Sequence, residues 1–189
     1  MEKITVMSST VEQYDAEVRT CQRIFLQKTR DYGTSWRVLR TISIADQLYI
    51  KARRIRTLQE AGEGKVGEDK AGEFRAMVNY GVIGLIQLSI EPGTAEELSA
   101  EEAGRRYDEK IAFARETMDA KNHDYGEAWR DMSQESFTDL ILMKLLRIRQ
   151  IVANDGKTLI SEGIDSNYVD IINYSLFALI LITEGKHTQ

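Results

Sequence analysis

The sequence predicts an all-α protein, a helical bundle formed by two tandem repeats of about three helices that are related by a pseudo-twofold axis. Two observations carry this prediction. Apolar residues recur at helical spacings, without the alternation of β-branched residues between turns that marks strands. The second half of the chain also repeats the first. With 189 residues, the chain is long enough for both copies to share one core.

The repeat is clearest in one block of residues. Residues 28–37 and residues 121–130 both read Lys-x-x-Asp-Tyr-Gly-x-x-Trp-Arg, at a separation of 93 residues (121 − 28). The match continues on both sides of this block and slips by one residue in the last part of each copy. Matched pairs outside the block include Tyr14/Tyr107, Ser43/Ser136, Asp46/Asp139, Lys51/Lys144, Arg54/Arg147, Arg56/Arg149, Asn79/Asn173 and Tyr80/Tyr174.

The break between the copies is marked by Pro92 and Gly93, neither of which continues a helix. Ser99 and Glu102 then have the spacing of a capping box, which restarts a helix. We therefore place the first helical repeat at residues 1–91, a linker at 92–98 and the second repeat at 99–189 of one compact body.

Each copy is expected to contain three helices joined by short loops. The Asp-Tyr-Gly segments are placed in the connection after the first helix of each copy, with short extra turns around the two tryptophans. Glycines 62, 64 and 67 mark the loop before the third helix, and residues 154–156 mark its counterpart. The six helices are predicted near residues 10–30, 43–61, 70–90, 99–121, 136–154 and 165–184.

The composition limits the classes of function. The net charge is −5, and acidic and basic residues are interspersed, which argues against direct binding to a nucleic-acid backbone. Cys21 is the single cysteine, and the N-terminus lacks the apolar core of a signal peptide, so we expect a cytoplasmic protein. The apolar run at 171–182 is too short to cross a bilayer and is predicted as a buried helix. The oligomeric state stays open, with a homodimer as one option.

The repeated block has the residue types of a nucleotide site. Its tyrosines and tryptophans can stack on a base, its lysines and arginines can meet phosphate oxygens, and its glycine lets a ligand approach the backbone. The alternative is structural: the aromatics plug the end of the bundle, and the aspartates make turn hydrogen bonds. The block contributes Lys28, Asp31, Tyr32, Trp36, Lys121, Asp124, Tyr125, Gly126, Trp129 and Arg130 as candidate substrate-binding residues.

Asp139 is a candidate metal ligand on the second helix of its copy. Because it follows Ser136 by three residues, it equally suits a capping box that closes the start of a helix. Lys144 and Arg147 follow it on the same helix and would grip phosphate, as would Arg54 in the first copy; otherwise these charges form a solvated face.

The last helix places Asp170 and Asn173 inside an apolar run, where a carboxylate must be paired or bind a metal. With Glu162, Asp165 and Asp139, Asp170 would supply the hard oxygen ligands that suit Mg²⁺. In the alternative, Asp165 is an N-cap and Asp170 pairs with Arg147 or Arg149. Asn173 would either read a base or bridge two helices.

The two copies differ at this point. Ala76 stands where the second copy has Asp170, and Glu73 stands where it has Asn167. Two identical active sites are therefore not expected. The sequence favours one working site beside a degenerate partner, or one composite site that uses Glu68, Asp69 or Glu73.

At these residues the chain resembles the nucleotide-modification-associated domain 1 family. The shared patterns are the Lys-x-x-Asp-Tyr-Gly block, Lys144-x-x-Arg147-Ile148, and Asp170-x-x-Asn173-Tyr174; the first copy departs from them at Ala76. The resemblance implies a role around nucleotide metabolism or base modification. More distantly, the acidic helices look like all-α nucleoside triphosphate pyrophosphohydrolases of the MazG and dimeric dUTPase type, which implies Mg²⁺ held by Glu and Asp.

The sequence thus predicts a nucleotide-binding protein that acts as an Mg²⁺-dependent nucleoside triphosphate pyrophosphohydrolase. In this hypothesis Glu162 and Asp170 are catalytic, and they share the metal with Asp139 and Asp165. Lys144 and Arg147 hold phosphate, and Asn173 is on the substrate side. The alternative is a noncatalytic nucleotide-binding or assembly module built from a helical repeat.

Overall fold

The computed structural model describes residues 9–61, 70–160 and 162–186, and these ranges contain helices and loops but no strand. The all-α prediction is confirmed, and each copy contains three α-helices and one short 3-10 helix. The elements are α1 (Thr10–Tyr32), η1 (Ser35–Val38), α2 (Thr41–Ala61), α3 (Lys70–Ser89), α4 (Ala100–Tyr125), η2 (Ala128–Asp131), α5 (Gln134–Ala153) and α6 (Ile164–Thr183).

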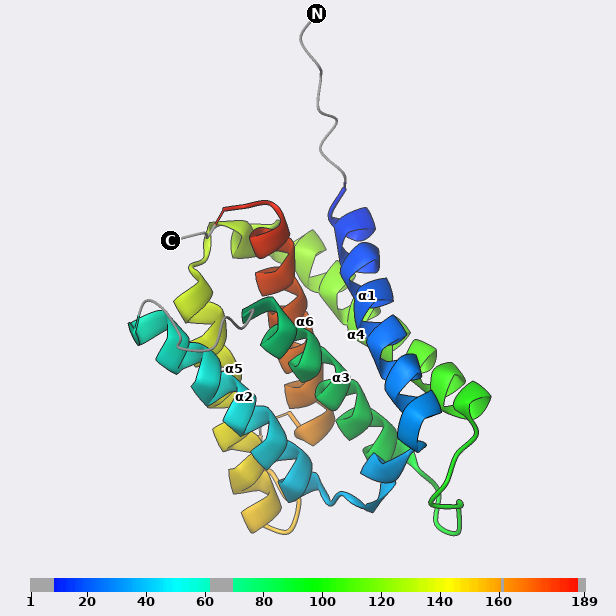
Figure 1. Ribbon diagram of the computed structural model, residues 1–189. Helices are drawn as coiled ribbons and strands as arrows, with labels where there is room; N and C mark the ends of the chain where they lie inside the picture. The colour runs from blue at the N-terminus through cyan, green and yellow to red at the C-terminus, as the bar shows by residue number, and fades with distance from the viewer. Residues whose placement is uncertain (1–8, 62–69, 161, 187–189) are drawn as a thin grey trace, which may run out of the picture.

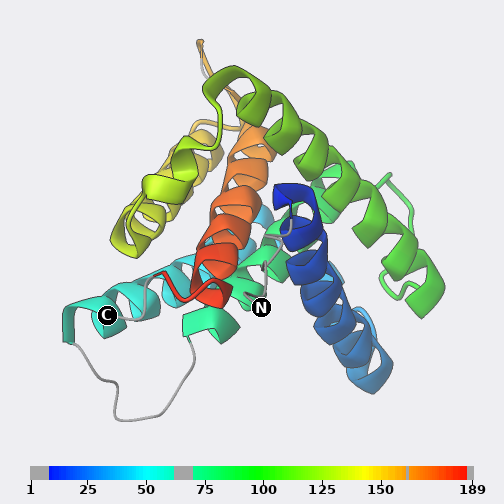
Figure 2. The ribbon, with the colours of Figure 1, turned by 90° about the horizontal axis from the view of Figure 1, so that it is seen from above.

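The helices lie in three paired layers, each with one helix from each copy (Figure 1). α3 and α6 form the middle layer, α2 and α5 cover one side of it, and α1 and α4 cover the other. Figure 2 shows the same pairs from above. Like helices thus meet like helices, as the predicted pseudo-twofold relation requires.

Two reciprocal hydrogen bonds carry this symmetry through the core. The Tyr14 hydroxyl donates to Asn173 Oδ1 at 2.8 Å, and the Tyr107 hydroxyl donates to Asn79 Oδ1 at 2.8 Å. Each amide nitrogen in turn donates to a carbonyl of its own copy's first helix, that of Ala114 for Asn173 and that of Cys21 for Asn79, both at 3.0 Å. Each asparagine therefore bridges the two copies, as the structural alternative for Asn173 predicted.

The middle layer depends on a close approach at two glycines of α3. A Cβ on Gly81 would lie 2.7 Å from Ile172 Cγ1, and one on Gly84 would lie 2.6 Å from the Tyr168 ring. Both distances are too short for a real contact. The helices pack this closely because α3 carries glycine where α6 carries Ser175 and Ala178.

α6 is the core helix of the molecule. By length and composition it would pass as a membrane span, but 78% of its most apolar window is buried inside the protein. Ile171 to Leu181 are all buried except Tyr174, which is partly buried. The predicted buried helix is thus confirmed.

The helix ends differ from the prediction in two places. Asp31-Tyr32 and Asp124-Tyr125 do not lie in loops but form the last turns of α1 and α4, because the helices run on to Gly33 and Gly126. These glycines have φ of 69° and 64°, a conformation that favours glycine. The glycines predicted to mark the loop before α3 lie outside the described residues.

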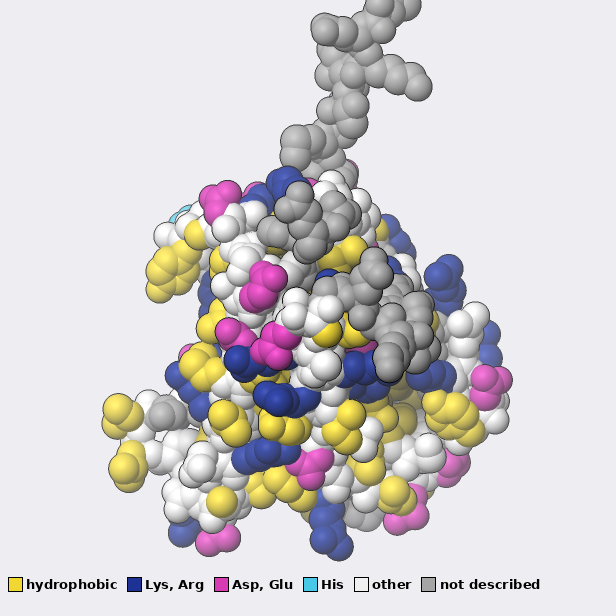
Figure 3. Space-filling model, turned by 60° about the vertical axis from the view of Figure 1, so that its left-hand side comes forward, with side chains coloured by type: hydrophobic (Ala, Val, Ile, Leu, Met, Phe, Trp, Pro, Cys, Tyr) yellow, Lys and Arg dark blue, Asp and Glu magenta, His cyan; other side chains and the backbone are white. Residues whose placement is uncertain are grey.

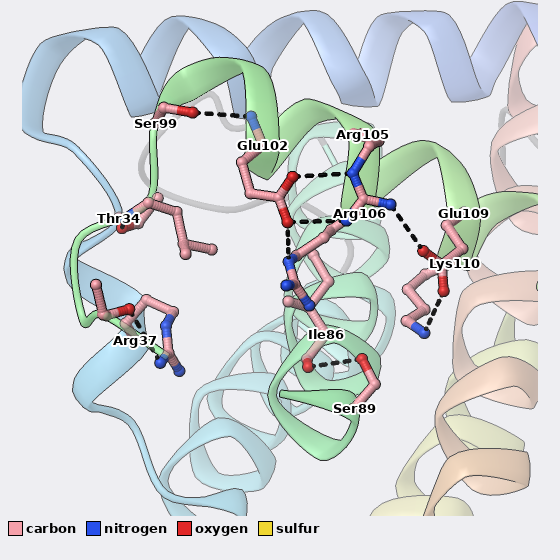
Figure 4. A network of polar contacts seen from close by, with 12 residues as sticks. Thr34, Arg37, Ile86, Ser89, Ser99, Glu102, Arg105, Arg106, Glu109 and Lys110 are labelled. Atoms are coloured by element: carbon pink, nitrogen blue, oxygen red, sulfur yellow. Dashed lines mark hydrogen bonds and ion pairs between the residues drawn. The ribbon is translucent and has the colours of Figure 1, made fainter. Parts of the chain in front are cut away.

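The N-caps were predicted correctly for α4 and wrongly for α5. Ser99 accepts from the Glu102 amide at the start of α4, while the Glu102 carboxylate accepts from Arg105 and Arg106 instead of closing a capping box (Figure 4). In α5 the cap is Ser133, so Ser136 and Asp139 both lie within the helix. The prediction rested on Asp139, which follows Ser136 by three residues and does not act as the acid of a capping box.

Candidate functional site

The first copy contains a cavity of about 480 Å³ between α1, α2 and α3. Figure 1 shows α3 running between α2 and α1, and residues of all three helices line the cavity. The volume lies within the range of small-molecule sites. Basic, aromatic and amide side chains line it, among them Lys28, Tyr32, Trp36, Lys51, Asn79 and Tyr80.

The cations of this cavity are only partly neutralised. Lys28 is exposed and makes no ion pair with another described residue. Lys51 Nζ lies 3.5 Å from Glu73 Oε2 and 5.7 Å from the centre of the Tyr80 ring. Arg75, also on the cavity wall, contacts Glu17 at 3.7 Å. An incoming anion would therefore meet Lys28 without displacing a partner.

Two tyrosines and a tryptophan give the cavity flat apolar surfaces. Tyr32 is 57% exposed at its edge, and burial together with nearby Tyr80 and Asp31 raises its pKa. Tyr32 therefore stays neutral at physiological pH. Trp36 is buried beneath, with no hydrogen-bond partner for its indole nitrogen among the described residues. Such rings are the usual platform for a nucleobase.

The linker between the copies packs against Gly33, which lines the cavity, and against Thr34. A Cβ on Gly33 would displace the end of the Glu97 side chain, and the positive φ of this residue favours glycine. The next residue, Thr34, donates to the Glu96 carbonyl and accepts from the Leu98 amide (its place beside α4 is seen in Figure 4). The repeated glycine thus serves chain packing in this copy.

In the second copy the corresponding position holds a buried ion cluster. Lys121 Nζ lies 2.7 Å from Asp170 Oδ1, and Lys144 Nζ lies 2.6 Å from Asp170 Oδ2. The side chains of Lys144 and Asp170 are 9% and 7% exposed. Burial opposes the charge of Lys121, but the hydrogen bond to Asp170 offsets this and raises its pKa. Asp170 is thus paired, to two lysines rather than to Arg147 or Arg149.

The acid that pairs with the lysine of the second helix lies one helical turn earlier on the third helix in the first copy than in the second. In the first copy Glu73 pairs with Lys51 and, at 3.0 Å, with Arg54. Ala76 stands at the Asp170 position, so no carboxylate reaches between Lys28 and Lys51. Lys28 is left available at the cavity as a result.

The structure does not bring the four predicted metal ligands together. No group of three or more Asp, Glu, His or Cys side chains in the described ranges is placed to hold a metal ion. Glu162 and Asp165 are exposed, and Gly163, not Asp165, is the N-cap of α6. Both oxygens of Asp170 face lysines. Glu68 and Asp69 lie outside the described residues.

Asp139 takes part in a second reciprocal contact between the copies. It lies 3.5 Å from Arg56, while its counterpart Asp46 lies 2.7 Å from Arg149. Arg149 also sits 4.2 Å above the Tyr49 ring. These pairs join α2 to α5. The side of the molecule on which these helices lie is turned forward in Figure 3, where basic and apolar side chains are interleaved. Residue spacing along one helix cannot show that an acid faces the other copy.

The tryptophan and arginine of the second block are structural. Trp129 stacks on Phe177 with ring centres 4.2 Å apart, so it plugs the bundle end. Arg130 lies over Trp129 and donates to Glu127 at 2.6 Å and to Glu184 at 2.9 Å. The guanidinium is thus held by partners within the protein.

The remaining residues of the second block lie at the surface. Tyr125 is 78% exposed, and Asp124 lies beside His123 in solvent. Gly126 has open space around its Cα. Asp31 is likewise exposed in the first copy. Arg147 and Glu162 lie with the buried Asn167 around a separate, more open hollow of about 1000 Å³.

Sequence reasoning gave no site role to two residues of the first cavity, Lys51 and Tyr80. Their signal was in the repeat itself, since Lys51 matches Lys144 and Tyr80 matches Tyr174. Carrying the candidate Lys144 over to the first copy would have found Lys51, and Tyr80 directly follows Asn79, the counterpart of the candidate Asn173.

Comparison with known proteins adds one finding. A family model described as nucleotide modification associated domain 1 matches residues 28–88 and, a second time, residues 121–182. The two matched regions coincide with the two copies and begin at the paired lysines. No curated protein and no solved structure matches the chain.

Proposed function

Because the chain belongs to the nucleotide modification associated domain 1 family, we propose that it binds a nucleotide and that the cavity of the first copy is the binding site. One observation carries the proposal. The cavity combines the ammonium group of Lys28, which has no ion-pair partner among the described residues, with the aromatic surfaces of Tyr32 and Tyr80. A phosphate group would bind the ammonium group, and a base would stack on the aromatic rings.

The arrangement suggests where the phosphate and the base of the nucleotide would lie. The phosphate would lie at the α1–α2 side, between Lys28 and Lys51, and would compete with Glu73 for Lys51. The base would lie against Tyr32 or Tyr80, near the side-chain amide of Gln47. A cytoplasmic location, where free nucleotides are abundant, belongs to this proposal.

Hydrolysis with Mg²⁺ stays a prediction from the sequence. The described carboxylates do not converge on one point, and the acid nearest the cavity cations, Glu73, is held by Lys51 and Arg54. The residues described here therefore do not fit a metal site, and the proposal is confined to binding.

Isothermal titration of the full chain with nucleoside mono- and triphosphates, with and without Mg²⁺, tests the proposal. We expect one nucleotide per chain. Lys28→Met should weaken binding by about tenfold or more, because a charge-assisted hydrogen bond contributes about 1.5–3 kcal/mol. Arg23→Met removes the same charge from an exposed position of α1 outside the cavity and is the matched control.

Two results would overturn the proposal. One is the absence of binding by any nucleotide in the panel. The other is binding that Lys28→Met and Arg23→Met weaken equally, since that would reflect net charge and not this cavity. Release of pyrophosphate in the Mg²⁺ arm would test the hydrolysis prediction separately.

A further inference from the structure

We infer that the second copy contains the same anion site in a closed form, in which the Asp170 carboxylate occupies the place that a ligand's phosphate takes in the first copy. The inference rests on the proposed function for its ligand class. Its geometry rests on the internal symmetry alone.

The sequence repeat aligns the residues that would form the anion site in the two copies. Lys121 corresponds to Lys28 and Lys144 to Lys51 at the same separation of 93 residues. Asp170 corresponds to Ala76 after the one-residue slip, which is also the offset between the first residues of α3 and α6, Lys70 and Ile164. Both copies therefore place two lysines from their first and second helices toward one position on their third helix.

The chemistry of that position differs only in what supplies the negative charge. In the second copy one carboxylate oxygen faces each ammonium group, at 2.7 and 2.6 Å. This is how an oxyanion is held between two cations. In the first copy Ala76 supplies no charge at this position, Glu73 on the same helix contacts Lys51, and Ala76 lines the cavity.

Burial makes the carboxylate necessary in the second copy. Lys144 is 9% exposed at its side chain, and a buried ammonium requires a nearby anion. Removing the Asp170 carboxylate should therefore leave a site that binds a small oxyanion from solution. Formate has the size of the missing group, and inorganic phosphate is the larger probe.

The experiment is thermal unfolding of Asp170→Ala over a series of formate and phosphate concentrations, at constant ionic strength maintained with chloride. We expect the variant to unfold well below the wild type and to regain about 5 °C or more in a saturable manner, while the wild type shifts by no more than about 1 °C. Asp170→Asn is the control: its amide fills the space without the charge, so it should be destabilised and not rescued.

The reverse substitution tests the same inference in the first copy. Ala76→Asp should supply the missing carboxylate, raise the melting temperature above that of Ala76→Asn, and weaken nucleotide binding by at least tenfold. If Asp170→Ala folds only when formate is present, that is rescue and supports the inference.

Equal responses of Asp170→Ala and Asp170→Asn to formate, or no rescue of either, would overturn the inference. This failure is separate from that of the proposed function. The formate response does not depend on nucleotide binding by the wild type, and the Lys28 experiment does not depend on Asp170.

Discussion

The two copies of this protein share one scaffold and differ in the position of one acid on the third helix. Their backbones agree in helix order, in the positive φ of Gly33 and Gly126, and in the Tyr–Asn hydrogen bonds exchanged across the core. At the third helix, however, one copy has Ala76 beside an open cavity and the other has Asp170 between two lysines. The comparison teaches that contacts on which both copies depend were kept, whereas the site was free to diverge.

This division has a physical reason. A reciprocal contact, such as that of Tyr14 with Asn173, belongs to both copies at once, so losing one partner leaves a buried polar group of the other copy unpaired. A ligand site belongs to one copy alone. A substitution there, as at position 76, disturbs only its own helices.

The largest difference is expected between the two matched lysines of α5 and α2. Lys144→Met should destabilise the protein by about 2–4 kcal/mol, because it removes one partner from the buried Asp170. Lys51→Met should cost less than about 1 kcal/mol, since Lys51 is more exposed and lies 3.5 Å from Glu73. Urea unfolding of both variants gives the two values. Equal losses would mean that the copies are electrostatically alike.

The glycine contact in the middle layer should be nearly as sensitive. Gly84→Ala places a Cβ 2.6 Å from the Tyr168 ring and should destabilise the protein by about 1–3 kcal/mol. Gly104→Ala is the control, because its Cβ would meet only the end of the Leu26 side chain at 3.3 Å. The control should be neutral or stabilising, as alanine favours a helix. A stabilising Gly84→Ala would contradict the close packing of α3 on α6.

The core hydrogen bonds should be equivalent in the two copies. Tyr14→Phe and Tyr107→Phe each remove one hydroxyl donor from a buried asparagine and should each cost about 1–2 kcal/mol. Chemical denaturation of the two variants side by side measures the balance. A difference of more than about 1 kcal/mol between them would show that the two hydrogen bonds contribute unequally to stability, although their geometry is symmetric.

The smallest effect concerns the starts of the two first helices, which differ in their acids. Ser9 and Glu12 form a complete capping box on α1, whereas Glu102 on α4 accepts a hydrogen bond from Arg105. This hydrogen bond is the main reason that the pKa of Glu102 is lowered to about 2. A lowered folded-state pKa stabilises the protein above the unfolded pKa, near 4.3, and this contribution is lost as the pH falls toward 2. Glu102→Gln should therefore be slightly less stable than the wild type at pH 6, and the gap should close between pH 4 and pH 2 in unfolding experiments. A gap that persists at pH 2 would assign the effect to packing.

The fold could be predicted from the sequence because every element appears twice. The predicted 165–184 helix and the observed α6 differ by one residue at each end, and the two tryptophans do lie in short extra turns as expected. The exceptions were local, such as the N-cap of α5, which is Ser133 and not the predicted Ser136. Because Asp139 follows Ser136 by three residues, the spacing favoured the wrong serine.

The site could be predicted only in part, because partners from distant helices are not visible in a one-dimensional pattern. Asp170 was recognised as a buried acid that needs a partner, but its partner Lys121 lies on α4, and two nearby arginines were predicted instead. Asp139 has the residue type of a metal ligand yet pairs with Arg56 of the other copy. In both cases the residue type showed that the acid needs a cationic partner or a metal. The sequence did not show which helix the side chain faces.

The central claim is that a nucleotide occupies the first copy and not the second, and the two tryptophans report on it directly. Trp36 lines the first cavity, and Trp129 stands at the matching place in the second copy. In a titration followed by ¹⁵N–¹H correlation spectra, with the indole signals assigned through Trp129→Phe, we predict that the Trp36 indole resonance shifts to saturation while that of Trp129 stays in place. A shift of the Trp129 resonance alone, or equal shifts of both, would contradict the account.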